Sequence, residues 1–533
     1  MNTIHPLYSA RSALPFVPTL KKPMPKNISL LLLLCLFLTA CEIPGVGGTP
    51  TPALPQDTGT GVAGGAREDA APVALRSLAL TDCALPTDGN QQVNARCGSL
   101  NVPEDRADPN GRQITLNIAL VPAIKRKPAP DPLFLLAGGP GQSAVATFPV
   151  MVQVLGNIHE NRDIVLVDQR GTGKSNLLQC LDPEKDENLT DQQSIERLQA
   201  CPAQLKAKAD LRFYTTEIAM QDLDAVRAAL GYETINLYGA SYGTRAALTY
   251  LRMFPKRVRT ITLDAVVDPS FVMLMDAAGD GQKSLDFFFA RCAADAACHT
   301  AFPNLKTEFD ALLKRLDAAP ATITIPHPVT NNPLTLTVTR KMLTGMVFNT
   351  LYSPDMVAML PLEIHVAYAD GNYTPLISQA YLLDAKSADG MFYSVICAED
   401  APLITAPAAE KLSQGSVFGD RALDLLKVCA QWPQGSVSAA FRNPVVSNVP
   451  ALIFSGQADP ITPPWHAAKV AASFSNELHL VFKGMGHGNL SSRCTANLLK
   501  DFIESASIAG LKTDCVAEIA PPPFFVNFNG PRP

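Results

Sequence analysis

The chain has 533 residues, of which 47% are hydrophobic, and its formal net charge at pH 7 is −5. At roughly 100–200 residues per domain, this length makes one elaborated domain or two to three smaller ones with a sizeable core. The slightly acidic balance gives no electrostatic reason to expect a nucleic-acid partner. The composition therefore indicates a globular protein and argues against a basic nucleic-acid-binding domain.

Residues 1–41 have the features of an export leader. An apolar run extends from Ile28 to Leu38 and is followed by small residues up to Cys41. This run is too short to span a bilayer, which takes about 20 residues, but it fits the apolar core of a secretory signal. Leu38-Thr39-Ala40-Cys41 is similar to the lipobox of bacterial lipoproteins, in which the cysteine carries lipid. We therefore expect membrane anchoring through Cys41; an ordinary cleaved signal peptide is the alternative.

A flexible tether is expected behind the leader. Residues 42–75 are rich in Gly, Pro, Thr and Ala, a composition typical of a linker. The expected location is the cell envelope, on its periplasmic face or at the cell surface, or outside the cell if Cys41 carries no lipid. Either Met1 or Met24 starts the chain.

The cysteines agree with export. Of the 12, Cys35 lies in the leader and Cys41 is the expected lipid site, which leaves an even number for disulfides. In chain order the others form five short pairs, although the sequence leaves their connectivity open: Cys83 and Cys97, Cys180 and Cys201, Cys292 and Cys298, Cys397 and Cys429, Cys494 and Cys515. The cysteines and histidines do not have zinc-binding spacing, so we expect neither a metal nor another cofactor.

The first folded part, expected at 76–268, alternates strands with helices. Apolar runs predict early strands and then buried parallel strands at 97–102, 114–121, 133–137, 164–167, 235–238 and 258–263. Helical spacing is present at 217–230 and at 242–254. This alternation predicts a mostly parallel sheet with helices on both faces.

The alternation is lost in residues 269–446, which we interpret as a cap. Helices are expected at 284–294, 305–316 and 421–430, and a strand pair within 322–339. The strand pattern resumes at 451–455 and 478–482, each with a helix behind it. A largely helical insertion between two parts of one sheet is the simplest account, with the second part at 447–520 and a tail at 521–533.

A candidate nucleophile lies between a predicted strand and a predicted helix. Gly239-Ala240-Ser241-Tyr242-Gly243 has the form G-x-S-x-G. A sharp strand-to-helix turn exposes the serine, and the flanking glycines let the backbone pass. The start of the helix adds free N–H groups beside it. This context predicts that Ser241 is a nucleophile.

Serine needs a base to accept its proton, and the two final strands lead to candidates. Asp459 follows one strand and His487, within Gly486-His487-Gly488, follows the next. His487 would take the serine proton, and Asp459 would orient the imidazole and stabilise its charged form. His466, in a predicted helix, and His479, in a predicted strand, are interpreted as structural.

An oxyanion needs two aimed N–H donors. We expect one from Tyr242, directly after the nucleophile, and one from Gly139 in the glycine-rich loop 138–143. Residues 168–175 end in Gly-Lys-Ser but have Asp168 where a phosphate-binding loop requires glycine, so a nucleotide site is rejected. That segment is expected to pack beneath the oxyanion loop.

Five motifs in order carry a family resemblance: the Gly138 loop, Asp168-Gln169-Arg170-Gly171, Gly-Ala-Ser241-Tyr-Gly, the Asp459 loop and Gly-His487-Gly. From about Cys83 to Cys515 the chain resembles the proline iminopeptidase and tripeptidyl aminopeptidase family of α/β-hydrolases. The resemblance implies that Ser241, Asp459 and His487 form a triad, and that the inserted segment caps the site. It further implies an acidic cap residue that holds the substrate's α-amino group, for which Glu399 is the best match; a solvated acidic pair with Asp400 is the alternative.

Three functions remain open. The leading hypothesis is an exported aminopeptidase that releases short N-terminal units, such as tripeptides or proline-type residues, from peptides. A carboxylesterase acting on small esters is second, because the same triad serves both reactions. A non-catalytic binding protein is third, and the complete triad argues against it. No obligate protein partner is indicated.

Overall fold

The computed structural model describes residues 78–87, 91–152, 154–182, 186, 189–328, 330–382, 387–419 and 421–531. The leader, the tether and the expected lipid site Cys41 lie outside the described residues, and their assignments stay predictions. The remainder of this section concerns the described residues of the unit at 72–533.

A nine-stranded sheet forms the centre of this unit, in the order β1-β2-β3-β5-β4-β6-β7-β10-β11. Its strands are β1 (Thr81–Pro86), β2 (Gln92–Pro103), β3 (Gln113–Val121), β4 (Leu133–Leu136), β5 (Ile164–Val167), β6 (Ile235–Ala240), β7 (Val258–Asp264), β10 (Ala451–Gly456) and β11 (Glu477–Phe482). The pairs β1–β2, β2–β3 and β3–β5 are antiparallel, and all pairs from β5 to β11 are parallel. The expected mostly parallel sheet is confirmed.

Helices cover both faces of the sheet because its central strands are apolar on both sides. Every residue of β4, β5 and β10 is buried. Along β4, Phe134 and Leu136 belong to one core cluster, together with residues of α4 (Thr216–Ala229) and α5 (Tyr242–Met253). Leu133 and Leu135 belong to a second cluster, together with residues of α16 (Arg493–Ser505). Because successive side chains of a strand point to opposite faces of the sheet, each of these strands contributes side chains to both cores.

The described residues of the two sheet-forming parts contain four further α-helices, which are α1 (Ala144–Thr147), α2 (Gly156–His159), α3 (Asp191–Leu205) and α15 (Pro464–Ala471). The helix α3, which the sequence pattern did not predict, is capped by Thr190, whose side chain forms a capping box with Gln193. The capping signal was present in the sequence, but α3 is polar on most of its surface.

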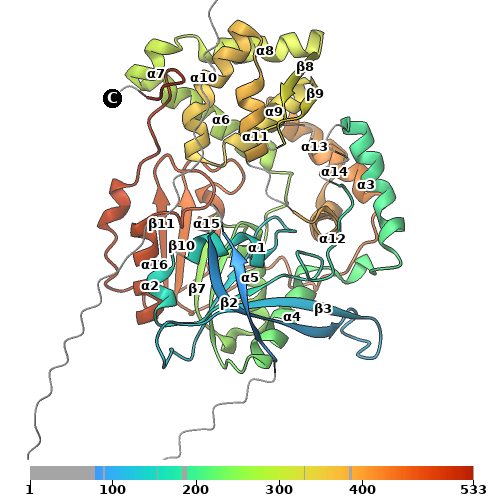
Figure 1. Ribbon diagram of the computed structural model, residues 1–533, viewed down its shortest axis with the longest axis vertical. Coiled ribbons are helices and arrows are strands. Elements are labelled where there is room, and N and C mark those ends of the chain that lie inside the picture. The colour runs from blue at the N-terminus through green and yellow to red at the C-terminus, as the bar shows by residue number, and fades with distance from the viewer. Residues whose placement is uncertain are drawn as a thin grey trace, which may run out of the picture. The chain divides into compact units, whose positions relative to one another are not determined.

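The described residues between β7 and β10 add no strand to the sheet. They form helices and one hairpin: α6 (Ala277–Ala294), α7 (Ala296–Ala301), α8 (Leu305–Ala318), β8 (Ala321–Pro326), β9 (Pro333–Val338), α9 (Arg340–Thr350), α10 (Pro354–Asp370), α11 (Thr374–Leu382), α12 (Asp389–Glu399), α13 (Ala406–Ser413) and α14 (Arg421–Cys429). Figure 1 shows α6 to α11 gathered beyond one end of the sheet. The predicted helices at 284–294 and 305–316 fall within α6 and α8, and the one at 421–430 matches α14 to within one residue.

The helix α6 begins seven residues before the predicted position, and tertiary packing explains why. Its first turns contain Gly279 and Gly281, which weaken helix propensity by about 1 kcal/mol each relative to alanine. A methyl group at Gly281 would lie 2.5 Å from the ring of Phe348 in α9. The glycine therefore makes room for a buried aromatic ring, and this contact is not encoded in local spacing.

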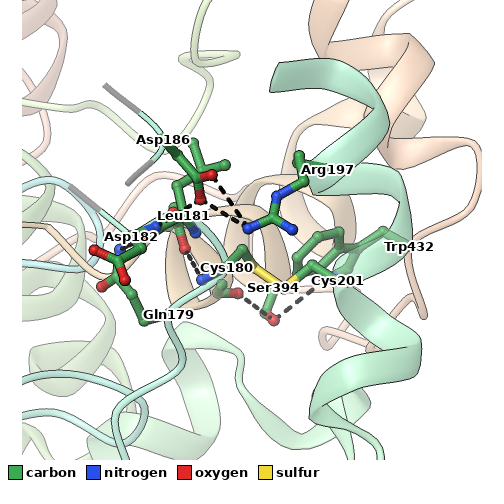
Figure 2. Close-up of a disulfide and its surroundings, with 11 residues drawn as sticks. Gln179, Cys180, Leu181, Asp182, Asp186, Arg197, Cys201, Ser394 and Trp432 are labelled. Carbon is green, nitrogen blue, oxygen red and sulfur yellow. Dashed lines mark hydrogen bonds and ion pairs between the residues drawn. A yellow bond between two sulfur atoms is a disulfide. The ribbon is translucent and has the colours of Figure 1, made fainter. Parts of the chain in front are cut away.

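Five disulfides join the ten cysteines of the described part, in the sequential pairs noted above. Figure 2 shows Cys180–Cys201, which ties the loop after β5 to α3, near the Trp432 indole that donates to Ser394 Oγ (3.2 Å). Cys397–Cys429 joins α12 to α14. Structural disulfides of this number are typical of proteins that fold outside the cytoplasm. In the described ranges, no helix is both long and apolar enough to cross a membrane.

Candidate active site

Ser241 occupies a tight turn between β6 and α5. Its backbone has φ 56° and ψ −126°, a conformation that costs a non-glycine residue about 1–3 kcal/mol. A methyl group at Gly239 would lie 2.3 Å from the Gly243 carbonyl oxygen, and one at Gly243 would lie 2.2 Å from the Leu136 carbonyl oxygen. Both flanking positions therefore need glycine for space, and the turn presents Ser241 at the carboxyl end of the sheet.

Ser241 and His487 line one cavity of about 680 Å³. The other lining residues come from the loop after β4, the end of β6, the residue after β7, the inserted segment and the loop after β11: Gly138, Gly139, Gln142, Ala240, Ala265, Asn349, Tyr352, Ala380, Tyr381 and Gly488. No carboxylate side chain is among these described residues. The lining of the cavity is therefore mostly uncharged, as is typical of a pocket that receives a neutral acyl group.

Asp459 binds the Nδ1 atom of the His487 ring. His487 Nδ1 lies 2.8 Å from Asp459 Oδ2 and 3.2 Å from Thr462 Oγ1. Asp459 is buried, and its carboxylate also accepts hydrogen bonds from the backbone N–H groups of Ile461 and Thr462, both at 2.9 Å. These contacts fix the carboxylate, and the carboxylate fixes the tautomer and the orientation of the imidazole.

The electrostatics of this pair favour the ionised form of both groups. Burial by itself would lower the pKa of His487, but the charge of Asp459 and the hydrogen bond to it outweigh burial, so the pKa is raised. Burial by itself would raise the pKa of Asp459, but His487 and the backbone donors hold that pKa below its usual value. The arrangement thus stabilises an imidazolium that forms during a reaction.

The inserted segment contributes directly to the position of His487. The backbone N–H of His487 donates to the Tyr352 carbonyl oxygen (2.8 Å), and the two rings lie 4.8 Å apart in an edge contact. A methyl group at Gly486 would lie 2.3 Å from the same carbonyl oxygen. The glycine before His487 therefore permits a close approach between the loop and the segment after α9.

Asp264 is a buried acidic residue that the sequence pattern did not single out. Its Oδ2 accepts hydrogen bonds from the backbone N–H groups of Asn489 (2.8 Å) and Leu490 (3.0 Å), and from the Tyr238 hydroxyl (2.9 Å). Its carbonyl oxygen accepts from the Ser241 N–H (2.9 Å). Asp264 thus ties the loop that carries His487 to the strand beside Ser241. An acidic residue that ends a buried apolar strand is the signal that could have revealed it.

The glycine-rich loop after β4 lies against Ser241. A methyl group at Gly138 would lie 3.0 Å from Ser241 Cβ, and Gly139 has φ +105°, which only glycine adopts readily. Asp168 supports this loop from outside the cavity, because its Oδ1 accepts from Ser143 Oγ (2.6 Å) and from the Val145 N–H (3.0 Å). The segment at 168–175 therefore contacts the loop, as the sequence indicated.

Replacing Gly139 with alanine should impair the loop strongly. Alanine is strained at φ +105°, and its methyl group would lie 2.9 Å from the Gly141 backbone nitrogen. If the Gly139 N–H is an oxyanion donor, its displacement should lower kcat by about 10²–10³ while the fold persists. Steady-state kinetics of Gly139→Ala measure the loss, with Gly156→Ala as control, since a methyl group there meets nothing within 4 Å. Equal kinetics in both variants would contradict the assignment.

Tyr242 is the first residue of α5, where N–H groups have no acceptor within the helix. The side chain of Tyr242 is engaged elsewhere, since its hydroxyl is buried and lies 2.7 Å from Thr216 Oγ1. Only the backbone of Tyr242 is therefore available as an oxyanion donor.

Glu399 lies behind α5 and is not among the residues lining the catalytic cavity. Its carboxylate accepts hydrogen bonds from the Thr216 N–H (2.6 Å) and the Thr216 hydroxyl (3.0 Å). Arg245 Nη1 is 3.6 Å away, and Arg245 also forms a bidentate pair with Asp400 (2.7 and 3.1 Å). Burial raises the pKa of Glu399 to about 7. The structure thus brings together Ser241, Gly139, Asp459 and His487, but not Glu399.

The two competing histidines have other partners. His466 is buried between Asp268 (2.7 Å) and Asp280 (3.3 Å), and His479 Nε2 lies 2.9 Å from Ser455 Oγ. Neither lines the cavity. Within the described part of the chain, no three His, Cys, Asp or Glu side chains are grouped as metal ligands.

Comparisons with known proteins agree with this architecture. The chain is 27% identical over 474 residues to the serine protease Hip1 of Mycobacterium tuberculosis, covering 80% of this chain and 88% of that protein. It is 34% identical over 224 residues to the tripeptidyl aminopeptidase of Streptomyces lividans (39% of this chain, 41% of that protein). It is 26% identical over 484 residues to carboxylesterase B of Mycobacterium tuberculosis (83% and 90%). Residues 131–492 match the α/β-hydrolase fold family. With a match over more than half of its length, the chain belongs to the α/β-hydrolase fold family.

Proposed function

We propose that the protein is an exported serine peptidase, an aminopeptidase that releases short N-terminal units from peptides through an acyl-enzyme. One observation carries the proposal: Ser241 and His487 line the same cavity, and His487 Nδ1 is bound by the buried carboxylate of Asp459 at 2.8 Å. The similarity to a serine protease and to a tripeptidyl aminopeptidase supports peptide substrates.

In the proposed mechanism, Asp459 occupies Nδ1 of His487, so Nε2 remains to accept the Ser241 proton. Ser241 Oγ then attacks the carbonyl carbon, and the N–H groups of Gly139 and Tyr242 stabilise the oxyanion. His487 returns its proton to the leaving nitrogen as the C–N bond breaks. A water molecule repeats the sequence on the acyl-enzyme, giving the free carboxylic acid and restoring Ser241.

Ester hydrolysis is the second candidate, and the lining of the cavity favours it. An aminopeptidase needs an anion to hold the substrate's ammonium group, yet no carboxylate is among the described lining residues. Glu399 stays a prediction for that role, and its contacts with Thr216 and Arg245 favour a part in holding α12 against α5. The similarity to carboxylesterase B also supports this candidate.

Turnover of matched substrates separates the two candidates. The purified protein would be given peptide amides with free or acetylated N-termini and a small ester. Cleavage of free-amine peptides alone would support the aminopeptidase. Ester turnover without peptide cleavage would assign a carboxylesterase, and cleavage of acetylated peptides would reject an amine requirement.

Export and anchoring complete the proposal. The disulfides of the described part support an oxidising compartment, and the lipobox-like segment supports lipidation of Cys41 at the membrane. Mass spectrometry of the mature N-terminus from a bacterial host tests this. A diacylated Cys41 is expected, whereas an unmodified N-terminus at another residue would indicate secretion.

A further inference from the structure

A second cavity of about 790 Å³ lies among α3, β9, α9 and α14, apart from the catalytic one. Its charged lining residues are Asp191, Arg340, Lys341 and Arg421. Lys341 is paired with Asp424 (2.5 Å) and Asp191 (3.3 Å), and Arg340 is paired with Asp317 (2.8 Å). Within the described part of the chain, Arg421 has no such carboxylate partner. Among the described residues, this cavity therefore carries one guanidinium without a carboxylate partner.

Arg421 is held in place by an aromatic ring and by the backbone of α9. Its guanidinium carbon lies 4.0 Å from the centroid of the Phe348 ring, a cation–π contact. A methyl group at Gly345 would lie 3.9 Å from Arg421 Nη2, so the guanidinium lies against α9 at that glycine. The side chain is half-buried. A partly desolvated guanidinium in a fixed position is suited to bind a carboxylate with two parallel hydrogen bonds.

The helix α9 connects this guanidinium to the catalytic cavity. Gly345 lines the second cavity, and Asn349, one turn further along, lines the catalytic cavity together with Tyr352. Positions 345 and 349 have the i, i+4 spacing of one helical face, and one turn spans about 5–6 Å. Tyr352 lies two residues beyond the end of α9 at Thr350. Tyr352 contacts the His487 ring. An extended peptide rises about 3.3 Å per residue, so about two residues cover the turn of α9 between the two linings.

We propose that Arg421 binds a carboxylate of the substrate, at least two residues from the bond that is cleaved. This inference rests on the proposed function and adds a substrate class, namely peptides with an anionic group at that distance. The carboxylate belongs either to an Asp or Glu side chain or to the C-terminus of a short peptide. Both sources present the same planar pair of oxygens to the guanidinium.

Paired peptides test the proposal. Short free-amine peptides would carry Glu or Gln at each of the three positions on either side of the cleaved bond, with a free or an amidated C-terminus. For the wild type we expect kcat/KM to be about tenfold to hundredfold higher for the peptide with the carboxylate at the matching position, as one charge-assisted hydrogen-bonded pair allows. Arg421→Gln should lose this preference, and Arg421→Lys should retain part of it.

The control is Arg340→Gln, which removes the same charge from the same cavity at a residue already paired with Asp317; it should keep the preference. Turnover of the uncharged peptides reports on the folding of every variant. An equal loss on Glu and Gln peptides in Arg421→Gln, or a wild type that shows no preference, would overturn the proposal.

Binding separates this inference from the proposed peptidase function. Titration calorimetry of the same peptides with Ser241→Ala requires no cleavage. Tighter binding of the carboxylate peptide that disappears in the double variant with Arg421→Gln would support the site, even if no peptide is hydrolysed. Equal binding of the Glu and Gln peptides would overturn it, even if peptides are hydrolysed.

Discussion

Replacing Ser241 with alanine is expected to lower kcat by on the order of 10⁶, with little change in the free energy of unfolding. The hydroxyl oxygen is the proposed nucleophile, so its removal leaves only the contribution of the oxyanion donors and of substrate binding. The positive φ of Ser241 remains with alanine, and the turn between β6 and α5 stays filled. Single-turnover kinetics on whichever substrate class is active measure the loss.

Ser99→Ala provides the matched control for this prediction. Ser99 is an exposed serine of β2 that contacts no part of the catalytic cavity, so full activity is expected. Residual activity of Ser241→Ala near the wild-type value would mean that another residue is the nucleophile. Thermal unfolding of the three proteins distinguishes a catalytic loss from misfolding.

The second large effect is expected from Asp459→Asn. An amide at this position can turn its NH₂ group toward His487 and select the wrong tautomer, so kcat should fall by about 10⁴ although the shape of the site is preserved. The buried position of Asp459 and its backbone donors make it the acidic member of the site. Steady-state kinetics at the optimal pH measure the loss.

Asp264→Asn is the informative comparison for Asp459→Asn. Asp264 is also buried and close enough to raise the pKa of His487, but its carboxylate binds the backbone after that histidine and not the ring. We expect a smaller loss of kcat and a larger loss of stability from Asp264→Asn. If the kinetic loss were larger in Asp264→Asn, the acidic role would move to Asp264.

The pH dependence follows from the same pair of residues. His487 must be neutral to accept the serine proton, so kcat/KM should rise as pH increases through the pKa of His487. Because Asp459 raises this pKa above 6.5, the acidic limb of the wild type should lie above pH 6.5. In Asp459→Asn the limb should shift to lower pH. The charge of Asp459 that raises the pKa of His487 is then lost, whereas burial, which lowers this pKa, remains. An unchanged limb would show that another group controls it.

The inserted segment contacts both His487 and the helix that follows Ser241. Tyr352 contacts His487 through its carbonyl oxygen and its ring, and Asp400 pairs with Arg245 of α5, the helix that follows Ser241. Glu399 joins the same region through Thr216 of α4. The inserted segment therefore takes part in positioning His487 and the helix α5.

The sequence alone determined eight of the nine strands of the sheet, all except β1, together with their mostly parallel arrangement and the candidates Ser241, Asp459 and His487. These features depend on local patterns: apolar runs bounded by turn residues, and motifs placed directly after strands. The ends of adjacent parallel strands meet at one edge of a sheet, so position along the chain was enough to bring Asp459 and His487 together. The sequential order of the cysteines also matched their pairing.

Only the tertiary structure decided the surroundings of Glu399, Asp264 and Arg421. Glu399 binds Thr216, which is 183 residues away in the chain, and nothing in the local pattern distinguishes that contact from a solvated carboxylate. The start of α6 was misplaced for the same reason: Gly281 is a weak helix former by itself, and its close contact with Phe348 of α9 is visible only in the folded structure. Periodicity reports which face of an element is apolar, whereas the partner that covers that face is chosen by the packing of the whole chain.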